Sequence, residues 1–147
     1  MKVYLDACCL NRPFDDQRQL RIRLESEAIV IVLEKFQSGE WQWLGSQALL
    51  YELSQNPDVE SRQRTLALAQ MAHESVALTE ETLGRAEALE QMGFDAYDAV
   101  HLACAEAGGA DVFLTTDDRV VKVAHRKKGL LNLRVDNPAR WLEEVLK

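Results

Sequence analysis

The sequence predicts an α/β fold with a mostly parallel central sheet. Short apolar runs alternate with longer stretches of helical periodicity, which is typical of parallel strands joined by helices. Two of these runs end directly on acidic residues, at residues 3–6 (VYLD) and 111–118 (DVFLTTDD). The carboxyl ends of parallel strands open onto a ligand crevice, so this edge of the sheet is the expected place for function.

The first half of the chain is predicted to hold two strands and three helices. Pro13 interrupts the segment after the first strand, so we expect a loop there, with Asp15 and Asp16 as candidate caps for the next helix. Ser46 and Asp58 are predicted N-caps of the second and third helices. The expected elements are a strand at residues 3–5, a loop at 8–16, a helix at 18–36, a strand at 41–44, a helix at 47–55 and a helix after residue 58.

The second half continues the alternation of helices and strands. Thr79 is a predicted N-cap, and Gly108 with Gly109 ends a helix, because glycine readily takes the left-handed conformation found there. Asn137 is a predicted N-cap followed by proline at the first helical position. The expected elements are a connector or strand at residues 76–78, helices at 80–92 and 95–107, a strand at 111–115, a short helix around 120–124, a strand at 130–135 and a helix at 138–147.

The composition indicates one globular domain covering residues 1–147. Hydrophobic residues make up 47% and charged residues 28%, which fits neither a disordered chain nor a membrane protein. No apolar run approaches the ~20 residues of a membrane span, and the N-terminus lacks a signal-peptide pattern, so we expect no membrane association. The odd number of cysteines and the absence of an export signal favour a cytoplasmic location and small buried thiols over disulfides or a zinc site.

The net charge of −7 at pH 7 argues against a protein that coats nucleic acid through its overall charge. It is compatible with a nucleic-acid enzyme whose acidic residues hold cations.

Four acidic residues are predicted to meet at the carboxyl edge of the sheet. Asp6 and Asp117 follow strands, Glu52 lies in the helix after a third strand, and Asp98 lies in the first turn of another helix. Right-handed crossovers in a parallel sheet bring all four to one edge. Crowded carboxylates repel one another unless a cation lies among them, and Mg²⁺ and Mn²⁺ prefer oxygen ligands. Such a site suits the in-line hydrolysis of a phosphodiester.

A simpler interpretation is available for every acidic residue, namely a solvated surface group or a helix cap. It is preferred for Asp15, Asp16, Asp95 and Asp118. Asp98 could interact favourably with the dipole of its helix without binding a ligand. The apolar residues on both sides of Asp6 make surface solvation a poor explanation for that carboxylate.

The order of the four acids resembles the PIN-domain family, and within it the VapC-type toxin ribonucleases. The resemblance rests on Asp6 after the first strand and on the segments LLYELSQNP, DAVHLACAEAGGADVFLTTDD and TTD, and it covers nearly the whole chain. It implies a three-layer α/β/α fold, Mg²⁺- or Mn²⁺-dependent cleavage of RNA, and often a homodimer inhibited by an antitoxin protein. It further implies that the catalytic, metal-binding acids are Asp6, Glu52, Asp98 and Asp117.

The sequence departs from the family pattern in two places. Many members carry a polar residue and then asparagine after the first aspartate, whereas Ala7 and Cys8 stand here, and Asn11 is a candidate for the missing amide. The doubled Asp117–Asp118 leaves the fourth acid open. Asp117 is preferred because of its distance along the chain from Thr115, which matches the hydroxyl residue before the last acid in the family.

Several residues are candidates for contact with the substrate. His101 either orients a phosphate or the Asp98 carboxylate, or simply packs beside its helix. Basic residues around Arg12 and at 126–128 can hold RNA phosphates, although cations at 126–128 are also favourable at a helix C-terminus without any ligand. The candidate substrate-binding residues are Thr115, Asn11, Arg12 and His101.

Three functions follow from these observations. The first is a metal-dependent endoribonuclease, the toxin of a toxin–antitoxin pair. The second is a PIN-fold nuclease that acts in RNA processing or on structured DNA, and the third is a non-catalytic PIN-like binding module. The presence of all four acids argues against the third. Three tryptophans and an apolar stretch at residues 29–33 also predict a homodimer or a small bound partner.

Overall fold

The computed structural model describes residues 1–146, and within them a five-stranded sheet forms the centre of the molecule. The strand order is β3-β2-β1-β4-β5, and every neighbouring pair is parallel. The sheet is therefore fully parallel, where the sequence predicted a mostly parallel one. The strands are β1 (Lys2–Leu5), β2 (Gln42–Ser46), β3 (Glu74–Val76), β4 (Val112–Leu114) and β5 (Arg134–Asp136).

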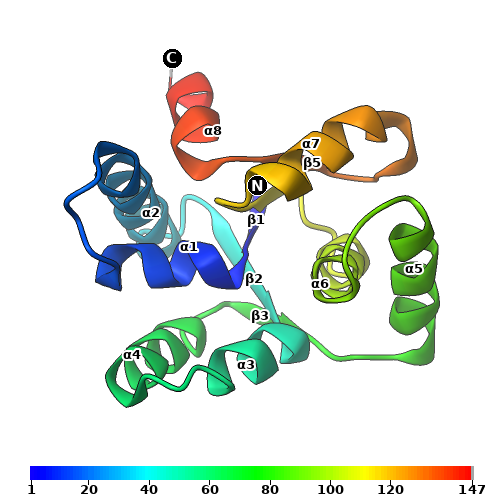
Figure 1. The fold of residues 1–147 in the computed structure, drawn as a ribbon, viewed down its shortest axis with the longest axis horizontal. Coiled ribbons are helices and arrows are strands. Elements are labelled where there is room, and N and C mark those ends of the chain that lie inside the picture. The colour runs from blue at the N-terminus through cyan, green and yellow to red at the C-terminus, as the bar shows by residue number, and fades with distance from the viewer. Residues whose placement is uncertain (147) are drawn as a thin grey trace.

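Helices cover both faces of this sheet, as Figure 1 shows with α2 on one side and α5 and α6 on the other. This confirms the predicted α/β/α arrangement. The helices are α1 (Ala7–Asn11), α2 (Leu20–Gln37), α3 (Gln47–Ser54), α4 (Val59–Ala69), α5 (Glu80–Gln91), α6 (Ala96–Ala107), α7 (Asp118–Arg126) and α8 (Pro138–Val145), with 3₁₀ turns at Arg12–Phe14 and Lys128–Leu130.

The alternation of side chains along the strands divides the core into two parts. Val3 and Leu5 of β1 pack with α1, α2 and α8 on one face, whereas Tyr4 points to the other face and packs with α5 and α6. β4 divides in the same way, with Phe113 on the face of Tyr4. β1 and β4 are therefore buried on both sides, which is why each contains a continuous apolar run.

The register of the strands aligns their carboxyl ends. Leu5 of β1 is paired with Leu114 of β4, and Leu114 with Asp136 of β5. The backbone pairing continues one residue further, because the Asp6 N–H donates to the Leu114 carbonyl at 3.0 Å. The residues that follow β1 and β4 consequently leave the sheet side by side.

Most predicted helix caps are present. The Ser46 hydroxyl accepts from the Leu49 N–H at 3.0 Å at the start of α3, and Asp58 and Thr79 cap α4 and α5 in the same way. Asn137 caps α8, and Gly109 has the left-handed φ of 76° expected after α6. Local sequence therefore sets where these helices begin and end.

Three predicted features differ from the structure. The segment 8–16 is not a loop, because the Asp6 side chain accepts from the Ala7 N–H and starts α1, and Pro13 lies in the 3₁₀ turn that follows. Asp15 and Asp16 do not cap α2, which begins after Gln19 without a side-chain cap. The last strand covers Arg134–Asp136 and not residues 130–135, because a 3₁₀ turn occupies Lys128–Leu130 and a bend follows it at residues 132–133.

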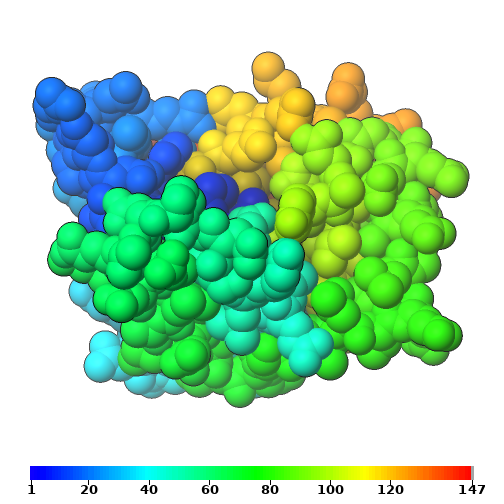
Figure 2. All heavy atoms as spheres, turned by 60° about the horizontal axis from the view of Figure 1, so that its bottom comes forward, coloured from blue at the N-terminus to red at the C-terminus, as the bar shows by residue number. Residues whose placement is uncertain are grey.

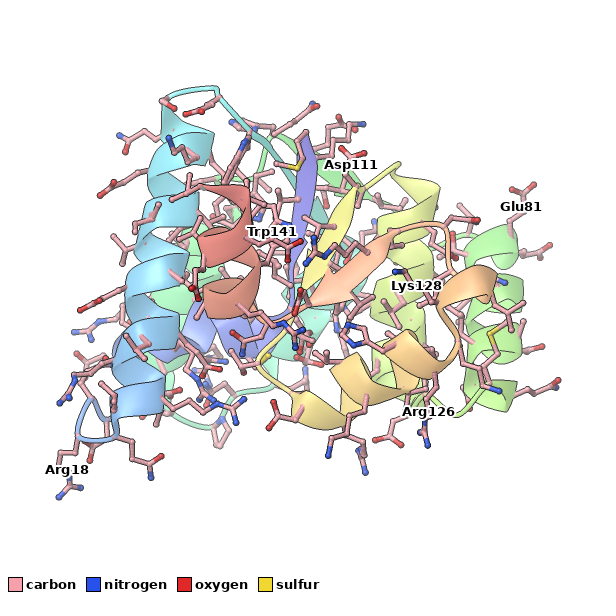
Figure 3. All side chains as sticks on the ribbon, turned by 90° about the horizontal axis from the view of Figure 1, so that it is seen from above. Arg18, Glu81, Asp111, Arg126, Lys128 and Trp141 are labelled. Atoms are coloured by element: carbon pink, nitrogen blue, oxygen red, sulfur yellow. The ribbon has the colours of Figure 1, made fainter. Side chains whose placement is uncertain are left out.

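Trp41, Trp43 and Trp141 are all buried within the chain, at 7%, 2% and 2% exposure. Trp141 belongs to α8 and lies on the side of this helix that faces the sheet (Figure 3), and its ring centroid is 5.0 Å from that of Trp41. The tryptophans are therefore core residues and supply no surface for a partner. Among residues 1–146, no helix has the length and apolar character needed to cross a membrane. The predicted helix at 138–147 ends at Val145, and Lys147 lies outside the described residues.

Candidate active site

The four predicted acids lie around one hollow at the carboxyl edge of the sheet. Figure 2 shows this hollow, with the first residues of the chain at its bottom and α3, α6 and the start of α7 along its rim. Each acid comes from a different element: Asp6 directly follows β1, Glu52 is on α3, Asp98 is in the first turn of α6, and Asp117 is the N-cap of α7.

Asp6 is held in one orientation by its neighbours. It is buried, at 6% exposure, and its Oδ1 accepts from the Ala7 N–H at 2.9 Å. The Thr115 hydroxyl donates to the other oxygen, Oδ2, also at 2.9 Å. Burial, with the charge of Glu52 nearby, raises the pKa of Asp6 above its ordinary value. The carboxylate is thus oriented but costly to ionise in the absence of a cation.

Glu52 and His101 lie beside Asp6. One ligand atom from each of the three residues falls within 4.8 Å of the other two, a spacing that could surround a metal ion. The His101 Nε2 is 3.2 Å from the Glu52 Oε1, and the ring is fully buried. Burial alone would lower the pKa of His101, but the hydrogen bond to Glu52 and the charge of Asp6 raise it above its ordinary value.

Asp98 completes the negative side of the hollow. Partial burial and the nearby charges of Asp6 and Asp117 raise its pKa to about 6. Asp117 is half-buried, and its Oδ1 accepts from the Arg119 N–H at 2.9 Å as the cap of α7. Asp98 and Asp117 lie outside the compact group of Asp6, Glu52 and His101, but they act on it electrostatically.

The two adjacent acids after β4 have different surroundings. Asp118 is exposed and accepts two hydrogen bonds from Arg21 of α2, at 2.7 and 2.8 Å. The Arg21 guanidinium lowers the pKa of Asp118. Asp117 faces the charge of Asp98 instead. This geometry favours Asp117 over Asp118 as the fourth acid of the site.

The other candidate residues are held by contacts within the protein. Thr115 is fully buried and bonded to Asp6, and its hydroxyl accepts from the Asp117 N–H at 3.2 Å. The Asn11 amide donates to the Ala7 carbonyl at 3.1 Å. Arg12 pairs with the buried Glu25 at 2.8 Å and with Asp15 at 2.9 Å. Thr115 therefore lies in the site as a support for Asp6, whereas the side chains of Asn11 and Arg12 are occupied elsewhere.

The basic residues at 126–128 are not part of the hollow. Arg126 and Lys128 project from the far end of α7 and the turn after it (Figure 3), away from the first turn of α7 that borders the acids. Arg18 extends into solvent at the start of α2 and pairs with Asp16. These positions favour a structural explanation for the basic run, as a cationic helix C-terminus.

Two residues, Cys8 and Tyr4, make contacts at the site that were not predicted from the sequence. The Cys8 thiol lies 3.6 Å from Asp6 Oδ2 and 3.4 Å from the Thr115 hydroxyl, and its sulfur accepts from the Thr116 N–H at 3.3 Å. The Tyr4 hydroxyl, on the buried face of β1, lies 2.8 Å from the His101 Nδ1. Cys8 was singled out only as a departure from a family pattern, and nothing in the strand VYL distinguishes Tyr4 from an ordinary core residue.

The donor set fits a hard divalent cation. Apart from the His101 ring, the groups of the hollow are carboxylates, which are the ligands that Mg²⁺ and Mn²⁺ prefer. Burial, together with the negative charge of neighbouring acids, raises the pKa of Asp6 and of Asp98. A cation among Asp6, Glu52 and Asp98 would remove that repulsion. Asp6 and Glu52, with His101 beside them, form the compact group that could hold it, and Asp98 and Asp117 lie outside that group.

Comparison with known proteins gave two matches to this architecture. The chain is similar in fold to a chain in the crystal structure of VapBC2 from Rickettsia felis bound to a DNA fragment from their promoter, with a TM-score of 0.59 and 16% sequence identity. That alignment covers 93% of this chain and 98% of the other. No curated protein sequence matches the chain significantly. The family model of the PIN domain matches residues 3–126, which include all four acids. By this match, and by a fold that agrees with it, the chain belongs to the PIN domain family.

Proposed function

We propose that this protein is a Mg²⁺- or Mn²⁺-dependent endoribonuclease that hydrolyses phosphodiester bonds in RNA. PIN domains are generally nucleases, and the chain retains an acidic hollow suited to that chemistry. The observation that carries the proposal is the compact group of Asp6, Glu52 and His101, which come from three separate elements, with the Asp98 carboxylate close enough to interact with the charge of Asp6. A surface with no role in binding cations would gain nothing from bringing these charges together.

Each acidic side chain has its own role in the proposed site. Asp6 is oriented by Thr115 and by the Ala7 N–H, so that its carboxylate faces the hollow in one conformation. Asp98 has a pKa of about 6 in the metal-free protein, so it is mostly ionised at neutral pH and would be available to hold the ion. In a site of this kind Mg²⁺ or Mn²⁺ supplies activation of the water and stabilisation of the leaving oxygen. Glu52 and Asp117 complete the set of acids that would hold the ion.

The proposal is tested with purified protein and an unstructured RNA labelled at one end. Cleavage should require Mg²⁺ or Mn²⁺ and should stop when EDTA is added. Asp6→Asn and Asp98→Asn should each lower the rate by at least ~100-fold, the scale of losing one positioned electrostatic contact. A double variant that cuts as fast as the wild type would identify the activity as a contaminant and overturn the assignment.

The same assay separates the other two functions. Preferential cleavage of branched or looped DNA, or of structured precursor RNA, would favour the PIN-fold nuclease of RNA processing or DNA metabolism. Binding of RNA without cleavage at any metal concentration would favour the non-catalytic module.

We further propose that the protein is the toxin of a toxin–antitoxin pair and works in the cytoplasm. The structural neighbour is itself part of a VapBC complex, which supports a small antitoxin protein as partner. Cys8, Cys9 and Cys104 are all free thiols, which supports a reducing compartment. Expression of the wild type alone should arrest growth of a host cell, whereas Asp6→Asn should not. Growth unaffected by active, soluble enzyme would contradict the toxin assignment.

Homodimer formation is a separate proposal. The exposed side of α2 carries Leu20, Leu24 and Val30, at 61%, 49% and 44% exposure, so this helix offers an apolar face outside the core. Light scattering on the purified protein should give the mass of two chains. A monomer at every concentration tested, with no partner retained during purification from the native host, would contradict the proposal.

A further inference from the structure

A continuous path of hydrogen bonds joins the first turn of α3 to the Glu52 carboxylate through the interior of the protein. The Ser46 hydroxyl lies 2.7 Å from the Tyr4 hydroxyl, which lies 2.8 Å from the His101 Nδ1. The His101 Nε2 in turn lies 3.2 Å from Glu52 Oε1. Ser46, Tyr4 and His101 are at most 1% exposed, so water cannot replace any of these partners.

The chemistry of the two groups decides which of them donates the hydrogen in the last hydrogen bond of this path. An ionised carboxylate only accepts hydrogen bonds, so the Nε2 of His101 must carry a hydrogen and donate it to Glu52. The Tyr4 hydroxyl can donate to Nδ1 when the ring is neutral or accept from it when the ring is charged. Ser46 accepts from the Leu49 N–H, and its own hydrogen remains free to turn toward Tyr4. Every buried polar atom of the path is satisfied.

The Tyr4 side chain, in the middle of the path, is held rigidly by its neighbours. The Tyr4 ring is stacked on Phe113 of β4, with centroids 5.2 Å apart and planes inclined by 10°. The position of the Tyr4 hydroxyl is therefore set by two neighbouring strands, the central strand β1 and β4. Ser46 is also the N-cap of α3, the helix that carries Glu52, so the path starts and ends on the same helix.

We propose that Tyr4 and His101 are positioning residues that hold the Glu52 carboxylate in the cation site, with His101 acting as a hydrogen-bond donor and not as a metal ligand. This inference rests on the proposed function, which supplies the metal ion. The path of hydrogen bonds itself is present without an ion. Such outer partners fix the orientation of a ligating carboxylate. Donation from Nε2 to one oxygen of Glu52 leaves the other oxygen for the cation.

The alternative, in which His101 is a metal ligand, requires a different protonation of the imidazole ring. Ligation of a metal by His101 requires a free lone pair on Nε2, and therefore a hydrogen on Nδ1 alone. That lone pair would face the Glu52 oxygen at 3.2 Å without a hydrogen between them, so the contact with Glu52 would become repulsive. The two arrangements consequently differ in whether Nε2 keeps its hydrogen when a cation binds.

The deciding experiment measures the protonation of His101 directly, by nitrogen NMR of protein labelled with ¹⁵N-histidine, first free of metal and then with saturating Mg²⁺. His101→Gln assigns the signal, and His125→Gln, at an exposed histidine on α7, is the matched control. We expect Nε2 to remain protonated in both states. Loss of the Nε2 hydrogen on addition of Mg²⁺ would make His101 a ligand and overturn the proposal.

Titration with Mn²⁺ alone, followed by electron paramagnetic resonance, supplies a second readout. Tyr4→Phe keeps the ring stacked on Phe113 and removes only the hydroxyl, so it should fold, shift the Nδ1 resonance and weaken Mn²⁺ binding by about 10-fold. His101→Gln retains an amide donor toward Glu52 and should bind Mn²⁺ more tightly than His101→Leu.

Two outcomes separate this inference from the function on which it rests. Folded Tyr4→Phe protein that binds Mn²⁺ as tightly as the wild type would overturn the positioning role of Tyr4 and His101, while leaving the metal site intact. Wild-type protein that binds no Mn²⁺ would instead overturn the proposed function.

Discussion

Arg21 of α2 holds Asp118 of α7 through two hydrogen bonds of 2.7 and 2.8 Å, and the same guanidinium donates to the Thr116 carbonyl at 3.1 Å. The segment between β4 and α7 is therefore fixed from the side opposite α6. With Asp118 turned toward Arg21, the preceding residue, Asp117, remains beside Asp98. The acidic doublet thus divides into one structural residue and one residue of the hollow.

This division predicts unequal effects of substitution. Asp117→Asn removes a charge from the hollow and should lower the rate of RNA cleavage by at least ~100-fold. Asp118→Asn removes a charge of the same size from an exposed ion pair, which contributes only about 0.2–1 kcal/mol to the stability of a protein. We expect it to lower the rate by less than about threefold. Single-turnover kinetics with both variants would show the contrast, and equal losses would mean that Asp118 belongs to the site.

Asp98 should make the metal-free protein less stable as the pH rises. Its folded pKa of about 6 lies above the ~3.9 of an unfolded chain, so the native state binds the proton more tightly. The resulting stabilisation is complete below pH ~4 and is lost as the pH rises to about 6. Asp98→Asn should therefore raise the metal-free melting temperature at pH 7.5. After a discount for solvent screening, we expect about 1 kcal/mol, or roughly 2–4 °C.

The control for this measurement is Glu87→Gln, which removes the same charge from an exposed position on α5. It should leave the melting temperature nearly unchanged at both pH 4 and pH 7.5. If Asp98→Asn melts below the wild type at pH 7.5 without metal, the repulsion inferred for the hollow is absent.

Binding of the cation should weaken in acid. Metal must displace the proton from Asp98, so the affinity for Mn²⁺ should be nearly constant above pH 7 and fall by up to about tenfold per pH unit below 6. Calorimetric titrations at pH 5.0, 6.0, 7.0 and 8.0 would measure this. Removal of metal with EDTA should lower the melting temperature at pH 8 and have little effect at pH 5. An affinity independent of pH would exclude Asp98 as a ligand.

Two glycines in helical segments should respond oppositely to alanine. A Cβ on Gly108, at the end of α6, would meet the Leu44 side chain and lie 2.8 Å from Val76 Cγ2, so Gly108→Ala should destabilise the protein by about 1–3 kcal/mol. Gly84, in the middle of α5, has nothing within 4 Å of a Cβ. Gly84→Ala should stabilise the protein by about 0.5–1 kcal/mol because alanine has the higher helix propensity. Urea denaturation of both variants tests the packing of α6 against β2 and β3.

The sequence was most informative where one local pattern decides the structure. Asp6 and Asp117 could be placed at one edge because parallel strands share a direction, and Ser46 could be recognised as a cap because capping needs only a few neighbouring residues. The short helix α1 was missed for the complementary reason. A helix of five residues has too few turns for a periodic pattern, and Pro13 close behind it indicates a break.

The contacts that hold the site residues in place could not be predicted from the sequence, because they depend on how segments far apart in the chain pack together. The contact between Tyr4 and His101 joins residues 97 positions apart, and the contact between Arg21 and Asp118 spans the same separation. Neither pair has a local signature. His101 could be named as a residue of interest from its place after Asp98, but its partner, Glu52, becomes apparent only once α3 and α6 lie side by side.

The central position of β1 also has a consequence during protein synthesis. β1 is made before both of its neighbours, β2 and β4. Thr115, which orients Asp6, comes 109 residues after Asp6 in the chain. A growing chain therefore carries Asp6 and Glu52 long before it can hold them in place. Long-range strand pairing of this kind is slow compared with helix formation. The hollow is absent until β4 and Thr115 have been made and β4 has entered the sheet, so a growing chain that stops before β4 has no assembled site.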